Sequence, residues 1–244
     1  MRVGHANIDG EAIASALGWW AMAGVDVLVE DDPRDWFAPA PPIAPPPAIA
    51  ATPTHHAITQ SPIPDVLEAL VAWLLQAETL PALGAQRSAP VGMAQAGAMA
   101  LTDMPEPGDA TEGRLLGGNP GRLFDAMLRA IGLDSSTLYL ASLSPAWLPA
   151  GPGESGLEET LVEIAQRHVA LAAPRAVLLL GDATTRALLG MSVAQARGRL
   201  HQLDSNGTAT VAVATFHPRF LLGQPARKAE AWADLRLFSE QLGK

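Results

Sequence analysis

The sequence contains no cysteine and few basic or aromatic residues. Without cysteine the chain can form no disulfide, no zinc–thiolate site and no cysteine-ligated iron–sulfur cluster. Its 16 Lys and Arg are outnumbered by 25 Asp and Glu, which gives a formal net charge of −9. This balance excludes a protein that coats nucleic acid by bulk charge, although a local basic groove stays compatible with it.

Long apolar runs are also missing. No run approaches the roughly 20 residues that span a bilayer, and the first residues lack the basic-then-apolar order of a signal peptide. We therefore expect a cytoplasmic protein without membrane contact, and a monomer. The 244 residues are 48% hydrophobic and only 17% charged, which is enough for one large folded domain.

Proline is plentiful but unevenly distributed. Nine of the 21 prolines lie between Pro39 and Pro64, in APAPPIAPPPAIAATPTHHAITQSPIP. Such a run favours polyproline conformation and excludes a helix or a central strand. The chain is therefore predicted to have three parts, namely an N-terminal helical segment over 1–37, a linker over 38–64 and a main domain over 65–244.

The N-terminal segment carries apolar residues at helical spacing, Ile13, Leu17 and Trp20. A helix of about three turns is marginal alone. Adjacent aromatic residues, here Trp19 and Trp20, are typical anchors of protein interfaces. We predict a tethered docking element for a protein partner; the alternative is a helix that folds back onto the main domain.

In the main domain, apolar strand-like runs alternate with amphipathic helical patterns. This order predicts an α/β fold of three layers (α/β/α) with a central, mostly parallel four-stranded sheet. The expected strands are 97–101, 137–143, 176–181 and 208–215, and the expected helices are 66–74, 122–131, 157–172, 183–189 and 226–242.

Ligands of such sheets bind beyond the C-terminal ends of the strands. The loops after Leu101, Leu143, Leu180 and Thr215 are therefore the candidate functional loops, and they contain the segments TDMPEPG, LSPAW, GDATT and FHPRFLL. Together with GRLLGGNPGRLF, these segments occur in an order and at intervals that resemble the uracil-DNA glycosylase superfamily. The resemblance covers about residues 67–242 and is nearest to the iron–sulfur bacterial and archaeal branch.

The resemblance implies a glycosylase that flips a uracil out of DNA and breaks its glycosidic bond. In that chemistry a carboxylate orients water and offsets positive charge on the sugar, while a histidine hydrogen-bonds the departing base. By the resemblance, Asp103 and His217 would be these catalytic residues. A two-residue gap in the first motif would instead match Pro107-Gly108 to the family's Pro-Gly and leave Pro105 at the acidic position.

The base-binding positions differ from the family pattern. Leu116 stands in place of the stacking phenylalanine and Ser142 in place of the asparagine that reads the uracil edge. Losing an aromatic platform or a bidentate reader costs about 1–3 kcal/mol each. We therefore expect Pro105, Leu116 and Ser142 to line a substrate site that is weaker or altered in specificity.

The resemblance also bears on cofactors and DNA contacts. The family's cluster cysteines fall near Pro81 and Leu161, where this chain has none, so no cofactor is expected. No histidine or carboxylate group has the spacing of a metal site. Arg197, Arg199 and Arg219 are predicted to form a modest rim that contacts the phosphates of DNA.

Two functions of different classes follow. The first is a DNA-repair N-glycosylase, a hydrolase acting on a flipped deaminated or damaged base, with single-stranded DNA or a flipped base as partner. The second is an inactive interaction protein on the same fold, for which the ψ subunit of the bacterial clamp loader is a precedent. A fold by itself does not decide between them.

Overall fold

The computed structural model describes residues 63–76, 78–94, 96–149, 151–152, 157–205 and 208–243. The predicted docking segment 1–37 and nearly all of the predicted linker 38–64 lie outside these residues. Their roles, and the boundary at residue 65, stay predictions. Within the described part of the chain, no helix is both long enough and apolar enough to cross a membrane.

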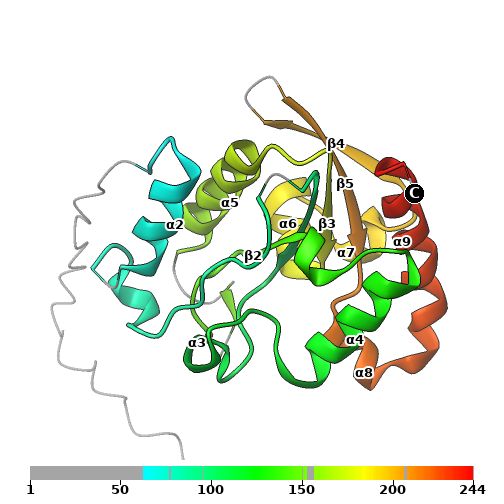
Figure 1. The fold of residues 1–244 in the computed structure, drawn as a ribbon, viewed down its shortest axis with the longest axis horizontal. Coiled ribbons are helices and arrows are strands. Elements are labelled where there is room, and N and C mark those ends of the chain that lie inside the picture. The colour runs from blue at the N-terminus through cyan, green and yellow to red at the C-terminus, as the bar shows by residue number, and fades with distance from the viewer. Residues whose placement is uncertain are drawn as a thin grey trace, which may run out of the picture. The chain divides into compact units, whose positions relative to one another are not determined.

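A mostly parallel sheet forms the centre of the domain, as predicted (Figure 1). It has five strands rather than the four expected, in the order β2-β1-β3-β5-β4. The first four of these are mutually parallel, and β4 is antiparallel to β5 at the edge. The strands are β1 (Ala98–Thr102), β2 (Tyr139–Ser142), β3 (Ala176–Leu180), β4 (Leu200–Ser205) and β5 (Thr208–Thr215).

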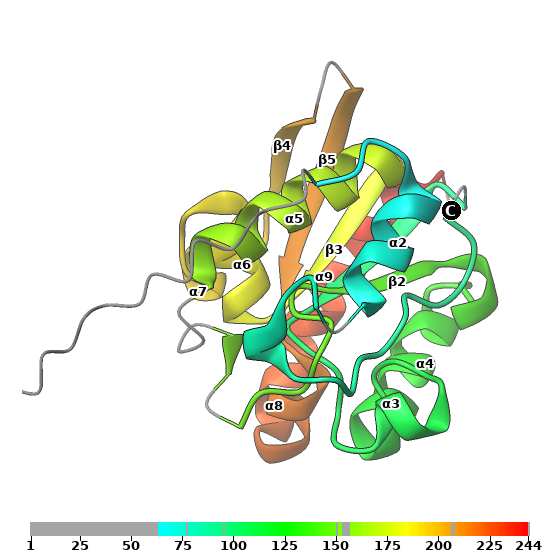
Figure 2. The same ribbon diagram turned by 90° about the vertical axis from the view of Figure 1, so that its left-hand side faces the viewer.

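The strand missed by the sequence prediction is β4. It pairs with β5 from Leu200↔Val213 to Ser205↔Thr208, so the two strands form a hairpin (Figure 2). An edge strand has one neighbour only and tolerates polar residues such as His201 and Gln202. The prediction relied on apolar runs and therefore overlooked this segment.

Strand side chains divide alternately between two cores. In β1, Met99 and Leu101 pack toward α2 (Leu67–Leu75) and α5 (Glu158–Ala172). Ala98 and Ala100 pack on the opposite face, toward α4 (Gly118–Ala130) and α9 (Lys228–Gln241). This alternation follows the two-residue period of a strand and gives the predicted three layers, visible in Figure 1.

The remaining helices are short. They are α3 (Asp109–Glu112), α6 (Asp182–Leu189), α7 (Val193–Ala196) and α8 (Pro218–Gly223). Three of them, α3, α7 and α8, were not predicted, because a single turn or two leaves too few residues for a periodic pattern. Pro218 begins α8 at the position where its missing N–H costs nothing.

Near Pro81 and Leu161, where the resemblance places the family's cluster cysteines, this chain is held by apolar packing and by one buried arginine. Leu161 and Leu80 are both buried in the core beside α2. Arg87 donates hydrogen bonds to the carbonyl oxygens of Leu74 (2.8 Å), Leu80 (2.5 Å) and Gly84 (3.1 Å). A guanidinium has enough donors to bind several carbonyls at once, so Arg87 fixes the turn that follows α2.

Gly121 marks the closest backbone approach beside α4. A Cβ at this position would lie 1.9 Å from the carbonyl oxygen of Leu116, whose own backbone has a positive φ of 59°. We predict that Gly121→Ala lowers the free energy of unfolding by about 1–3 kcal/mol, because backbone must shift to relieve the contact. Urea unfolding measures this. The control is Gly223→Ala, whose Cβ would meet no atom within 4 Å; equal stabilities of the two variants would contradict the prediction.

His168 on α5 is buried against β2, where its Nε2 lies 2.8 Å from the hydroxyl of Tyr139. Burial lowers the pKa of His168 to about 4, whereas a histidine in an unfolded chain titrates near 6.5. Between these values the unfolded chain binds more protons, so the contribution of His168 to stability is lost as pH falls below about 6.5.

We predict that His168→Gln, which can still hydrogen-bond Tyr139, flattens this dependence by roughly 1 kcal/mol per pH unit between pH 6 and 4.5. Urea midpoints of the full chain across that range are the measurement. Parallel curves for variant and wild type would show that His168 is not held neutral.

Candidate active site

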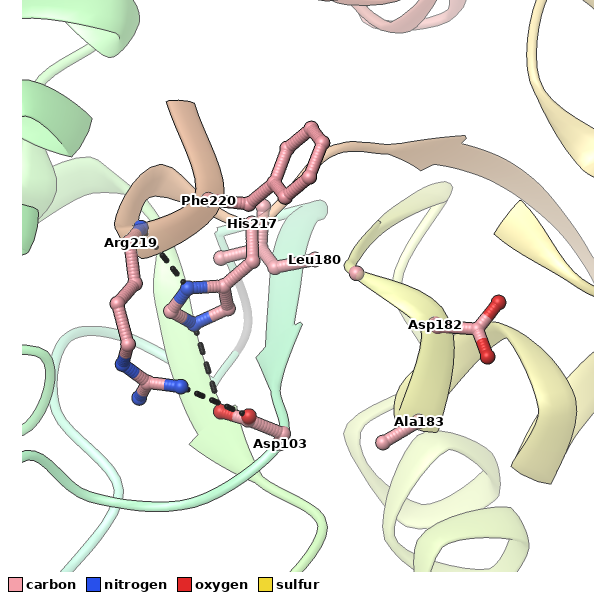
Figure 3. A pocket seen from close by; sticks show the side chains of 8 residues that line it. Asp103, Leu180, Asp182, Ala183, His217, Arg219 and Phe220 are labelled. Atoms are coloured by element: carbon pink, nitrogen blue, oxygen red, sulfur yellow. Dashed lines mark hydrogen bonds and ion pairs between the residues drawn. The ribbon is translucent and has the colours of Figure 1, made fainter. Parts of the chain in front are cut away.

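The loops after β1, β3 and β5 meet at one edge of the sheet. They bring together Asp103, Gly181 and His217, which are far apart in the sequence but follow neighbouring strands. A cavity of about 240 Å³ opens between them (Figure 3). It is lined by Asp103, Leu180, Gly181, Asp182, Ala183, His217, Arg219 and Phe220.

The imidazole of His217 is fixed at both ring nitrogens. Its Nδ1 accepts a hydrogen bond from the backbone N–H of Arg219 (3.0 Å) at the start of α8. Its Nε2 lies 2.8 Å from Oγ1 of Thr102 and 3.4 Å from Oδ1 of Asp103. Because Nδ1 is an acceptor, the proton of a neutral His217 must be on Nε2, which therefore donates.

His217 is also kept neutral. Its side chain is almost fully buried, and this burial lowers its pKa to about 4 in spite of the nearby carboxylate of Asp103. At neutral pH the ring is thus a hydrogen-bond donor without charge. It can therefore donate a hydrogen bond to an anion while the proton stays on the ring.

The two oxygens of Asp103 have different surroundings. Oδ1 accepts hydrogen bonds from the N–H of Met104 (2.8 Å) and from Oγ1 of Thr102 (3.3 Å). Oδ2 accepts from the guanidinium of Arg219 (3.2 Å) and, within the described part of the chain, from no other group. Oδ2 therefore keeps a free lone pair with which it can accept a hydrogen bond from water.

Arg219 joins Asp103 to a second carboxylate, that of Glu106. Its Nε and NH2 donate to Oε1 of Glu106 at 3.1 and 2.8 Å, while NH1 reaches Asp103. Burial alone would lower the pKa of Arg219, but Glu106 and Asp103 outweigh it and raise the pKa. Glu106 is positioned in turn by Asp109, whose Oδ2 accepts the N–H of Glu106 (2.8 Å).

The three predicted base-binding residues do not line this cavity. Leu116 is buried in the core on the α4 face and borders a separate cavity of about 510 Å³ between α4 and β2. Ser142 ends β2 in register with Thr102, and Pro105 is buried in the loop that follows Asp103. Asp103, not Pro105, is thus the residue of the first motif that lies beside His217.

The three predicted phosphate contacts differ from one another. Arg197 is occupied by Asp234 and Glu230 (both 2.6 Å), and its guanidinium lies 4.0 Å from the centre of the Phe216 ring. Arg199 is exposed and donates to the carbonyl oxygen of Gln195 (2.5 Å). Of the three, Arg219 alone lines the cavity, and its guanidinium is directed at carboxylates.

Sequence reasoning overlooked two residues that complete the site. Thr102 is fully buried and connects His217 to Asp103 through its hydroxyl. A threonine at the end of an apolar strand, directly before the candidate acid, was the available signal. Glu106 lies three residues after Asp103, but only its contact with Arg219, 113 positions later, reveals its place in the site.

The site has the composition of an acid–base centre. In the described ranges, no group of three or more histidine or carboxylate side chains is arranged to hold a metal ion. What the cavity offers is a carboxylate with a free lone pair, a neutral N–H donor and a buried setting that strengthens both.

The match to a known family covers this site and most of the domain. The family model described as the uracil DNA glycosylase superfamily matches residues 89–236, more than half of the chain. The chain belongs to the uracil DNA glycosylase superfamily. A search of curated proteins finds no match.

Membership accounts for the position of the site. The matched range contains every strand of the sheet and both Asp103 and His217. A domain of this superfamily is glycosylase-like and DNA-binding in general.

Thr102 offers a direct test of the hydrogen bonds in this glycosylase-like site. We predict that Thr102→Val lowers the free energy of unfolding by about 1–3 kcal/mol, because Nε2–H of His217 loses its acceptor in a buried setting. Urea unfolding is the measurement, and Thr102→Ser, which retains the hydroxyl, is the control. A valine variant as stable as the serine variant would show that the bond contributes nothing.

Proposed function

We propose that this protein is a DNA N-glycosylase that hydrolyses the bond between deoxyribose and a flipped, deaminated base. The observation that carries the proposal is the pairing of Asp103 with His217 at 3.4 Å in one cavity of a uracil DNA glycosylase-type domain. A carboxylate and a neutral imidazole suit the two ends of such a bond, where positive charge develops on the sugar and negative charge on the base.

Asp103 acts on the sugar side. Its ionised carboxylate offsets the positive charge that develops as the bond from C1′ to the base nitrogen lengthens. Oδ2 has a free lone pair and accepts a hydrogen bond from the attacking water. The water oxygen bonds to C1′, and the proton that the water loses goes to the carboxylate.

His217 acts on the base side. The base leaves with the electron pair of the broken bond, and the resulting anion accepts the N–H of Nε2. In the free protein this N–H donates a hydrogen bond to Oγ1 of Thr102. When a base is bound, the base replaces Thr102 as the acceptor. The tautomer is already set by the amide of Arg219, and the reaction needs no rearrangement of protons on the ring.

Recognition of the base is expected to be weaker than in enzymes with an aromatic platform and an amide reader. Leu116, which is buried beside a separate cavity, offers no ring, and Ser142 has a single hydroxyl. At about 1–3 kcal/mol for each missing interaction, rate or specificity falls by roughly 10²- to 10⁴-fold. We therefore propose a glycosylase for exposed bases, in single-stranded DNA, with relaxed choice among deaminated bases.

The decisive experiment incubates the full chain with single-stranded oligonucleotides that carry uracil, hypoxanthine or xanthine, followed by alkali to cut abasic sites. We predict base release by the wild type, slowed at least tenfold in His217→Ala and by roughly 10²-fold in Asp103→Asn, since each removes charge stabilisation of the transition state. His201→Ala, on the edge strand β4, is the matched control.

Base release that is equally fast in all four proteins would assign it to a contaminant. The absence of release from every oligonucleotide would overturn the proposal and favour an interaction protein on this fold. The binding of an abasic oligonucleotide by the same preparation then shows whether the domain still recognises DNA.

A further inference from the structure

Three charged side chains contact one another beside the cavity, and only one of them belongs to the reaction described above. Asp103 and Glu106 are separated by two residues, and Arg219 lies between their carboxylates with bonds of 3.2 Å to the first and 2.8 Å to the second. Glu106 and Asp103 are mostly buried, with side-chain exposures of 13% and 17%. All three nitrogen atoms of the guanidinium are engaged.

An arginine in this position has two opposed effects on a carboxylate that must offset positive charge. Its N–H holds one oxygen of Asp103 in place, which favours reaction. Its charge also neutralises that of Asp103 and would weaken the attraction to a cationic sugar. Without a further charged group, the net charge of Asp103 and Arg219 together would be zero.

Glu106 removes this conflict. With Glu106 included, the formal charges of the three side chains sum to −1, and neutral His217 adds no charge. Glu106 accepts hydrogen bonds from both Nε and NH2 of the guanidinium, and this contact orients NH1 toward Asp103. On the far side of the cavity, the carboxylate of Asp182 is paired with Arg186, so that pair adds no net charge.

We propose that Arg219 and Glu106 are positioning residues of the glycosylase site: Arg219 orients Asp103, and Glu106 restores the negative charge that Arg219 would otherwise cancel. This inference rests on the proposed function. It replaces the sequence-based expectation that Arg219 contacts a phosphate.

The chain permits a clean separation of side chain from backbone at this position. The amide of Arg219 fixes His217, whereas its guanidinium fixes Asp103. Substitution of the side chain therefore leaves the tautomer of His217 in place. Glu106→Gln likewise keeps an acceptor for Arg219 while it removes one charge.

Two single-stranded oligonucleotides serve as probes, and neither requires turnover. One carries a protonated pyrrolidine in place of a deoxyribose, and the other carries a neutral tetrahydrofuran at the same position. The ratio of their Kd values measures how strongly the site prefers positive charge at the sugar. Single-turnover rates on the best base-containing oligonucleotide are measured in parallel.

The wild type should bind the cationic probe more tightly. Glu106→Gln should reduce that preference about tenfold and slow turnover, since the trio becomes neutral. Arg219→Ala should retain or increase the preference yet slow turnover about tenfold or more, and guanidinium ion at tens of millimolar should restore part of the rate. Glu163→Gln, at an exposed position of α5, and Arg167→Ala, at a half-buried position of α5 that pairs with Asp65, match these charge changes and should alter neither quantity.

Other outcomes overturn the inference. If Arg219→Ala weakens both probes equally, with an unchanged ratio and a smaller salt dependence, Arg219 contacts a phosphate. An unchanged ratio in Glu106→Gln overturns the role of Glu106, and a slowed Arg219→Ala that guanidinium does not rescue overturns that of Arg219. If the wild type releases no base, the proposed function fails. The ratio of the two Kd values then still tests whether Arg219 and Glu106 set the preference of the site for positive charge.

Discussion

The ring of His217 accepts one hydrogen bond and donates another, and the rest of the site depends on this arrangement. The accepted bond comes from the first turn of α8, so the helix and the ring are fixed together. Room for the ring exists because residue 181 is glycine; a Cβ there would lie 3.0 Å from Cβ of His217. Gly181 also has a φ of 92°, which other residues rarely adopt. Gly181, directly after β3, thus leaves space for His217, in the loop after β5, to lie beside Asp103.

The apolar sheet determines how strongly these few polar groups interact. Side chains of β1 and β3 are buried on both faces, and the charged groups of the site lie where the strands end. In such a setting a charge is poorly screened, which is why burial keeps His217 neutral and why Arg219 needs two carboxylates as partners. Each charged group of the site therefore has a charged partner within contact distance.

The sequence predicts the parts of this molecule that follow from local patterns. Apolar runs predicted β1, β3 and β5, and the order of the motifs predicted that Asp103 and His217 follow strand ends. The edge strand β4 escaped because its polar residues give no apolar run, although Asn206-Gly207 is a common hairpin turn sequence. Nothing in the local sequence indicates that Arg197 pairs with Asp234 or Arg219 with Glu106, because these partners lie 37 and 113 residues away. Long-range ion pairs leave no mark on the local sequence.

The residues assigned to the sugar–base bond and those assigned to the base itself lie in different parts of the fold. Asp103 and His217, which act on the bond in the proposed mechanism, are held by hydrogen bonds from backbone and buried side chains. Leu116 and Ser142, which stand at the base-binding positions of the family pattern, lie toward α4 and at the end of β2. A change at the second pair therefore leaves the bonds of the first intact. In the proposed mechanism, a substitution that changes the choice of base can therefore leave the hydrolytic half of the site intact, whereas a substitution in Asp103, Glu106 or Arg219 changes the charge balance of that half.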